Sequence, residues 1–210
     1  MAGGTGPIVT GPALTGPRAG ANEKPSAMTG TEERILQAAL RVVSRRGVRY
    51  LSMAEVSEAA EVSRTTLYRY FATKEKLFDG VAAYDWQRFS EGLDKALAGA
   101  ASGSERTCVL LDYAVGYIND HPARELTESE PGFVIDYLRT MLPAVEAMLL
   151  GHLEEELAAA PPVVAGALSA QQVVDIMVRL LTTGWVLPTR DRSHLVATMD
   201  WLLHASPPAP

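Results

Sequence analysis

A short run in the first third of the chain carries side chains that suit contact with DNA. Residues 63–70 read Ser-Arg-Thr-Thr-Leu-Tyr-Arg-Tyr. Arginine can bond guanine or phosphate, while threonine and tyrosine reach bases, thymine methyl groups and phosphate oxygens. A short helix that exposes these groups suits the major groove. We predict that its outer face carries Arg64, Thr65, Thr66, Tyr68, Arg69 and Tyr70.

Two short helices and a tight turn must position these side chains. Ser52 can cap the first helix, and Glu55, three residues later, would complete a capping box. The turn is expected near residues 61–62. The buried stripe of the first helix is expected to consist of Val56, Ala59 and Ala60.

The second helix is predicted to begin at Ser63, which can cap it. Leu67 and Phe71 lie one turn apart and would face inward. A third helix is predicted to begin at Thr73. The segment 52–77 is therefore interpreted as a helix-turn-helix unit that continues into a longer helix.

The stretch 31–77 resembles the DNA-binding domain of tetracycline-repressor (TetR) family regulators. The resemblance rests on residues 35–39 (Ile-Leu-Gln-Ala-Ala), Gly47 and the run 62–71 followed by Lys-Glu at 74–75. Two positions depart from the family pattern, because Glu61 replaces the usual turn glycine and Ser57 replaces a common alanine. A non-glycine residue in a left-handed turn costs roughly 1 kcal/mol.

The resemblance implies a homodimer that binds a roughly palindromic operator in double-stranded DNA and responds to a small molecule. If the family's contact positions are transferred to this chain, the DNA bases or the DNA backbone would be contacted by Arg64, Thr65, Thr66, Tyr68 and Tyr70. Ser63 and Arg69 belong to the same predicted contact set. Phosphates would be held by Ser52 and Lys74. No cofactor is implied.

The charge distribution explains how an acidic chain can carry such a motif. The net charge is −6 over 210 residues, but residues 31–80 carry nine basic and seven acidic groups. Residues 81–210 carry eight basic and seventeen acidic groups. The basic charge therefore lies where the DNA motif lies, as a local electrostatic footprint requires.

Other functional classes lack sequence support. Cys108 is the single cysteine, which excludes an intrachain disulfide and fits a cytoplasmic protein. No apolar run is long enough to span a membrane, and no signal peptide is expected. No catalytic constellation, metal-ligand spacing or phosphate-binding glycine loop occurs. We therefore expect a protein that is not an enzyme and binds no metal.

The rest of the chain predicts an all-α fold of about nine helices. Residues 1–30 and 206–210 are expected to be disordered tails, because they are rich in glycine and proline and poor in material for a core. Residues 31–77 would form the DNA-binding domain, and residues 78–205 a ligand-binding and dimerisation domain. One long helix is expected from Pro131 to about Ala159, followed by a loop at 158–166.

The second domain is predicted to hold an apolar effector pocket. Large apolar pockets between helices are common sites for small molecules, and we expect a hydrophobic or amphipathic ligand. The alternative is that these side chains form an ordinary helical core. The candidate lining residues are Trp86, Phe89, Tyr113, Tyr117, Phe133, Tyr137, Met141, Met177, Leu181 and Trp185.

The last two helices are predicted to form a dimer surface, because neither shows a broad charged face. The alternative is burial within the monomer. The candidate interface residues are Val173, Ile176, Leu180, Leu195, Met199, Leu202 and Leu203.

These observations favour a ligand-responsive transcriptional regulator, most simply a repressor that a small molecule releases from its operator. Two alternatives stay open. One is a DNA-binding structural protein that has no ligand. The other is a helical carrier or enzyme whose helix-turn-helix does not bind DNA.

Overall fold

The computed structural model describes residues 30–187 and 191–204, and every structural statement below concerns these residues. Both predicted tails lie outside them, except that Gly30 begins the first helix. The elements in chain order are α1 (Gly30–Arg46), α2 (Met53–Ala59), α3 (Arg64–Tyr70), α4 (Lys74–Leu97), α5 (Ser104–Asp120), a 3-10 helix (Pro122–Glu125), α6 (Leu126–Ser129), α7 (Pro131–His152), α8 (Glu154–Ala159), α9 (Pro161–Val164), α10 (Ala170–Val186) and α11 (Arg192–His204).

The predicted all-α class is confirmed, with more helices than the nine or so expected. The expected long helix from Pro131 ends at His152, where Leu153 leaves the helical conformation before α8 begins. The four-residue helix α9 lies in the segment 158–166, where the sequence predicts a loop, and a second four-residue helix, α6, precedes α7. Helices this short make barely one turn, so they show no readable hydrophobic period.

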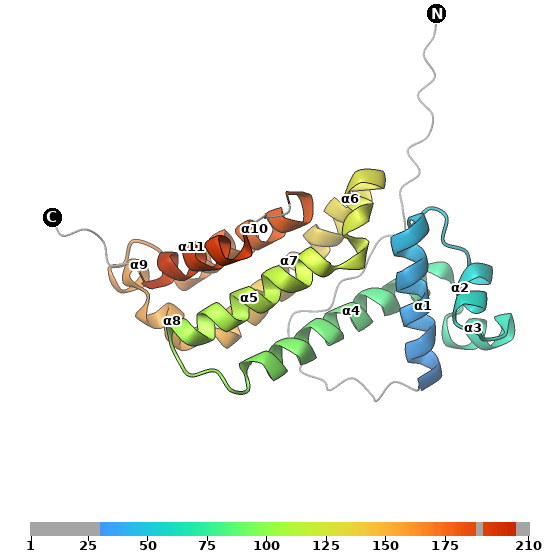
Figure 1. Ribbon diagram of the computed structural model, residues 1–210, viewed down its shortest axis with the longest axis horizontal. Helices are drawn as coiled ribbons and strands as arrows, with labels where there is room; N and C mark the ends of the chain where they lie inside the picture. Colours follow the sequence, from blue (N-terminus) through green and yellow to red (C-terminus); the bar gives the residue numbers. More distant parts are fainter. Residues whose placement is uncertain (1–29, 188–190, 205–210) are drawn as a thin grey trace, which may run out of the picture.

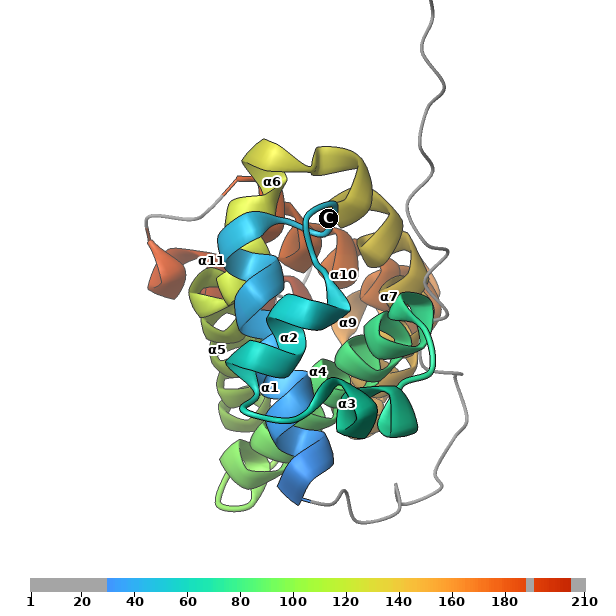
Figure 2. The ribbon, with the colours of Figure 1, turned by 90° about the vertical axis from the view of Figure 1, so that its right-hand side faces the viewer.

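The helix-turn-helix unit lies at one end of the molecule. Figure 1 shows α2 and α3 packed beside α1, and α4 running from them along the remaining helices. In Figure 2, α2 and α3 face the viewer in front of that bundle. The helix that follows α3 therefore connects the two ends of the molecule.

Two buried clusters hold the fold together. The first cluster contains residues from the four helices α1, α2, α3 and α4, for example Ile35, Val56, Leu67 and Phe78. It also includes Trp185 from α10. The second joins α4, α5, α7, α10 and α11, and its fully buried side chains include Leu93, Leu110, Leu149, Met177 and Met199.

The predicted domain boundary at residues 77 and 78 falls within α4. Both Leu77 and Phe78 belong to the first cluster, which continues along the helix to Tyr84 and includes Val134 of α7. The division into two domains stays a prediction. The structure shows a shared core at the junction, in which residues of α7 and α10 pack in the same cluster as residues of the helix-turn-helix unit.

The turn between α2 and α3 contains the departure noted in the sequence. Glu61 has a φ of 53°, which is the left-handed region that glycine adopts most easily. The Glu61 N–H donates to the Glu58 carbonyl at 3.0 Å, and the Val62 N–H donates to the Ser57 carbonyl at 2.9 Å. This pair of bonds is a Schellman helix end. Arg34 of α1 also donates to the Ala60 carbonyl at 3.3 Å.

Replacing Glu61 by glycine is expected to stabilise the protein by about 0.5–1 kcal/mol, because it removes the left-handed strain at some cost in unfolded-state entropy. The matched control is Ala59→Gly, at an exposed helical position two residues earlier, which should destabilise by up to about 1 kcal/mol. Urea unfolding of the three proteins measures both changes. Equal destabilisation by the two glycines would show that the strain at residue 61 is absent.

Candidate nucleic-acid interface and ligand pocket

Helix α3 is fixed to the protein by its cap and its inner face. The Ser63 hydroxyl accepts from the Thr66 N–H at 3.0 Å, so the predicted cap is confirmed. Leu67 is fully buried and Phe71 is 6% exposed. The inner face therefore packs as predicted, and Arg64, Thr65, Tyr68 and Arg69 of α3 are exposed.

The predicted contact residues of α3 differ in how far they are exposed. Arg64, Thr65 and Arg69 are exposed, as are Ser63 and Tyr68. These five side chains are free to meet a DNA groove without any rearrangement of the core.

Two further residues of the predicted set are half-buried. The Thr66 hydroxyl lies 2.8 Å from that of Ser63. Tyr70 packs against the first cluster, with the Arg69 guanidinium 5.4 Å from its ring centre. The structure thus brings together an exposed group of five side chains and a supporting pair behind it.

Both residues predicted to hold phosphates also have contacts inside the protein. Ser52 caps α2 by accepting from the Glu55 N–H at 3.2 Å. The expected capping box differs, because Glu55 accepts from the Ser52 hydroxyl at 3.0 Å and pairs with Arg46, instead of accepting from the Ser52 backbone. Lys74 donates to the Val48 carbonyl at 3.0 Å, so a phosphate contact would use its other N–H groups.

The expected buried stripe of α2 is corrected at one position. Ala59 is exposed, and the buried residues of α2 are Val56 and Ser57. The Ser57 hydroxyl donates to the Ala54 carbonyl at 2.8 Å, which satisfies it in the core. Residue 59 lies in the last turn of α2, and its carbonyl accepts from Arg41 of α1 at 3.5 Å while its side chain is exposed.

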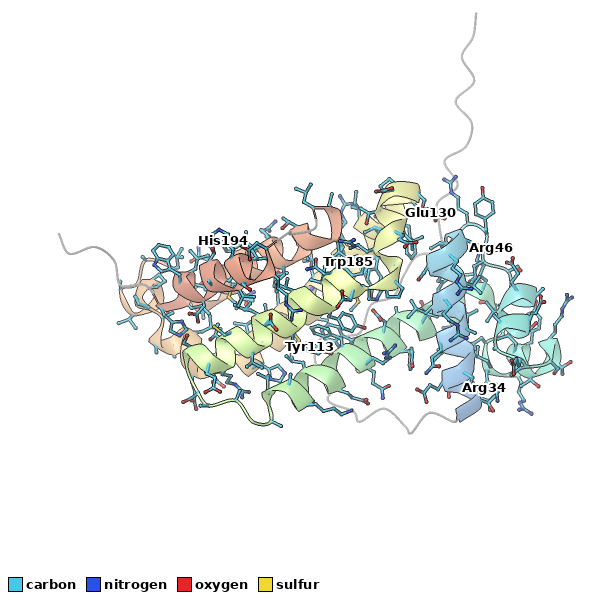
Figure 3. The ribbon with its side chains drawn as sticks, viewed as in Figure 1. Arg34, Arg46, Tyr113, Glu130, Trp185 and His194 are labelled. Atoms are coloured by element: carbon cyan, nitrogen blue, oxygen red, sulfur yellow. The ribbon has the colours of Figure 1, made fainter. Side chains whose placement is uncertain are left out.

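An apolar pocket lies between α4, α5, α7 and α10. Its cavity volume is about 80 Å³. Side chains predicted from the sequence that line it are Trp86, Phe89, Tyr117, Tyr137, Met141, Leu181 and Trp185. Figure 3 shows Trp185 where α10 approaches the other helices.

Three predicted pocket residues lie elsewhere. Met177 is 1% exposed and belongs to the second core cluster, so its assignment to the pocket is corrected. Phe133 lines an adjoining cavity together with Asp85, His121 and Tyr137. Tyr113 contacts the ring of Phe89 at 5.5 Å and lines a more open hollow, and Figure 3 shows it between α4 and α5.

A buried carboxylate, Asp85, lies at the wall of this pocket and is 6% exposed. Its Oδ1 accepts from the Tyr117 hydroxyl at 2.6 Å and lies 3.0 Å from His121 Nε2. Its Oδ2 accepts from the Tyr137 hydroxyl at 3.2 Å. Helices α4, α5 and α7 and the residue that follows α5 thus meet at one anionic group.

The hydrogen bonds keep Asp85 ionised. Burial opposes the charge, but the donors His121, Tyr117 and Tyr137 outweigh burial and hold the pKa of Asp85 below its usual range. Burial and the neighbouring carboxylate raise the pKa of both tyrosines, so both remain neutral donors.

The sequence reasoning missed Asp85 and His121. The signal was available, because Asp85 interrupts the apolar stripe of α4 at helical spacing after Phe78 and Val81. A charged residue on a buried face requires partners. His121 follows Tyr117 by one helical turn, and no sequence feature indicates that both point to α4.

A second set of contacts joins α7 to the helix-turn-helix unit. The Glu130 carboxylate, at the start of α7, accepts from the Arg49 N–H at 3.2 Å. It also lies against Gly47, which has a φ of 88° and follows α1. Figure 3 shows Glu130 near the end of α1 that carries Arg46.

The predicted dimer residues divide into two groups. Val173, Met199 and Leu203 are at most 5% exposed and belong to the second core cluster, so their placement in a dimer interface is corrected. Both helices are apolar on adjoining faces, and the sequence alone did not distinguish the face that packs on α5 and α7. The remaining candidates are exposed or half-buried, namely Ile176, Leu180, Leu195 and Leu202.

Two other types of site are absent from the part of the chain that the structure describes. In residues 30–187 and 191–204, no three His, Cys, Asp or Glu side chains come together in a way that could hold a metal ion. None of the described helices has the length and apolar character needed to cross a membrane.

Comparison with known proteins identifies the helix-turn-helix unit. Residues 35–81 match the family described as "Bacterial regulatory proteins, tetR family". An HTH-type transcriptional regulator of Mycobacterium tuberculosis is 26% identical over 167 residues, which cover 77% of each chain. The HTH-type transcriptional repressor KstR of Mycolicibacterium smegmatis is 32% identical over 87 residues, or 41% of each chain.

Solved structures extend the likeness to the whole fold. The fatty acid degradation regulator FadR of Bacillus halodurans matches 85% of this chain and 96% of its own with a TM-score of 0.62 at 19% identity. A TetR-like regulator from Rhodococcus matches 82% of this chain and 93% of its own with a TM-score of 0.53 at 18% identity. These relatives are transcriptional regulators and not enzymes. Residues 35–81 therefore carry the DNA-binding domain of the tetR family of bacterial regulatory proteins.

Proposed function

We propose that the protein is a ligand-responsive repressor that binds a palindromic operator as a homodimer in the cytoplasm. The observation that carries this proposal is the double role of α4. The helix begins at Lys74, close behind α3, and three of its residues line the pocket, namely Asp85, Trp86 and Phe89. The repressor role is supported by the relative KstR, which is named as a repressor.

The exposed side chains of α3 are proposed to read the operator. In helix-turn-helix dimers the two recognition helices meet half-sites one helical turn, about 34–36 Å, apart. A change in the spacing or tilt of the two α3 helices therefore weakens binding at both half-sites together.

The pocket is proposed to control that spacing through α4 and α7. A molecule held against Asp85 and Trp86 would displace α4, and the shared core would pass the displacement to α1 and α3. The contact of Glu130 with Arg49 offers a second connection from α7. Because coupling is reciprocal, operator DNA and effector then weaken each other's binding by the same factor.

Replacing Arg64 by alanine is expected to weaken operator binding by about 1–3 kcal/mol, because Arg64 is exposed at the start of α3 and can bond a guanine edge. The matched control is Arg139→Ala, which removes an exposed arginine from α7. Gel-shift titrations use a duplex that the protein selects from random-sequence DNA. If the two variants bind the selected duplex with equal affinity, Arg64 does not contact the operator.

The ligand response is tested by filling the pocket. Thr182 is half-buried and lines it, so Thr182→Trp is expected to abolish release of the selected duplex by compounds that release it from the wild-type protein. The control is Thr140→Trp on α7, outside the pocket lining. If no compound in a broad library of apolar and amphipathic molecules releases the duplex from the wild-type protein, the proposal of a ligand response is wrong.

A further inference from the structure

We propose that the effector carries a protonated amine at one end of an apolar body, and that Asp85 holds this amine. The inference rests on the proposed ligand response and specifies the chemical class of the ligand. Three features support this ligand class, namely the charge of the cluster around Asp85, its unused acceptor site and the rings that surround it.

The charge of the cluster is not balanced inside the protein. His121 Nδ1 lies 3.1 Å from the Ala123 N–H, which donates to it, so this nitrogen carries no proton. The proton of the neutral ring is then on Nε2, which donates to Asp85. The other two donors are tyrosine hydroxyls. All three partners are neutral, so the cluster carries the negative charge of one carboxylate.

No arginine or lysine among the described residues pairs with Asp85; its close basic partner is His121, which would supply a positive charge only with both ring nitrogens protonated. Arg88 lies nearly one turn further along α4, but it is exposed and its guanidinium lies 5.8 Å from the ring of Tyr84. A buried carboxylate without a cation is unusual, because burial penalises the charged form. A cation that enters the pocket would restore neutrality at this position.

The carboxylate also keeps an acceptor site for the ligand. Oδ1 accepts two hydrogen bonds, whereas Oδ2 accepts one, from Tyr137. An ionised carboxylate offers about four acceptor positions. One position on Oδ2 is therefore available to an N–H donor, and such charge-assisted bonds are among the strong ones.

The surroundings of Asp85 favour an ammonium group attached to an apolar chain. The rings of Tyr137 and Trp185 lie 6.3 Å apart and both line the pocket, and their faces can attract a cation. Beyond them the lining is aliphatic, with Leu138, Leu142 and Val145 from α7. A fatty acid would place a second negative charge beside Asp85, which like-charge repulsion disfavours.

Isothermal titration of the full-length protein compares three ligands with the same ten-carbon chain, namely decylammonium, decan-1-ol and decanoate. We expect decylammonium to bind at least 10-fold more tightly than either of the others. The Asp85→Asn variant, in which the charge is removed, should lose at least 10-fold in affinity for decylammonium and little for decan-1-ol. The control Asp136→Asn removes an exposed carboxylate of α7 and should leave all three affinities unchanged.

The comparison of the three ligands on the wild-type protein does not depend on the folding of the variant. If decanoate or decan-1-ol binds as tightly as decylammonium and releases the selected duplex, the amine class is wrong and the proposed ligand response stands. If none of the three binds, the amine proposal is likewise overturned. The ligand response is then judged separately, by the library and the Thr182→Trp variant. Retained affinity for decylammonium in a folded Asp85→Asn protein also overturns the proposal.

Discussion

Replacing Gly47 by alanine is expected to destabilise the protein by about 2–3 kcal/mol, for two separable reasons. Gly47 has a φ of 88°, and the left-handed conformation costs other residues roughly 1–2 kcal/mol. The added methyl group would also overlap Glu130 Oε1. The carboxylate can move away only by giving up its bond to the Arg49 N–H, which is worth about 1 kcal/mol.

A double-mutant cycle separates the two terms. In a Glu130→Ala background the overlap is absent, so Gly47→Ala should cost about 1 kcal/mol less than in the wild-type background. Urea unfolding measures the four free energies of unfolding. Gly132→Ala serves as the control, because an added methyl group at Gly132 meets no neighbouring atom and the position lies in α7.

An equal cost of Gly47→Ala in both backgrounds would mean that Glu130 does not restrict this position. In the proposed ligand response, this contact would connect α7, part of which lines the pocket, to the loop after α1. Its loss is expected to weaken the effect of a pocket ligand on DNA binding as well as the stability.

Local signals were sufficient for the helix-turn-helix unit. Ser52 and Ser63 each accept from the N–H group three residues later, as their positions before apolar helices predict. Leu67 is buried because it lies on the inner face of a short helix with a single apolar side. The left-handed turn at Glu61 could also be placed, because the spacing of the two helices leaves no other position for it.

Contacts between residues far apart in the sequence could not be predicted from local patterns. Met177 and Trp185 are both apolar residues of α10, yet of the two only Trp185 lines the pocket, whereas Met177 packs in the second core cluster. The partners of Asp85 come from three later segments, and only folding brings them together. A sequence can show that Asp85 needs a partner, but not which one it finds.

Local patterns also could not show which residues of the last two helices are buried within the protomer. Some of the predicted dimer residues are buried and others are exposed. On α10, Val173 is 5% exposed and Ile176 is 42% exposed, although they are only three positions apart. On α11, Met199 is fully buried and Trp201 is 64% exposed. Each helix packs one apolar stripe on the protomer, and large apolar side chains remain exposed at Ile176 of α10 and Trp201 of α11.

Replacing Ile176 by aspartate is therefore expected to convert the proposed dimer to monomers and to weaken operator binding by about 10²–10⁴-fold. A single protomer can occupy only one half-site, so the gain from simultaneous binding of two sites is lost. Sedimentation measures the mass in solution, and gel shifts measure the affinity for the selected duplex. The control is Ile135→Asp on α7, which is 45% exposed and should leave the mass and the affinity unchanged.

Val173→Asp distinguishes loss of the dimer from loss of the fold. Val173 packs in the second cluster, so a charge there is expected to unfold the protomer and to lower its melting temperature. Ile176→Asp should instead keep the helical circular dichroism spectrum of the wild-type protein, because its side chain is outside the core. A dimeric Ile176→Asp protein with wild-type DNA affinity would place the dimer surface away from α10, and Trp201→Asp would then test α11 separately.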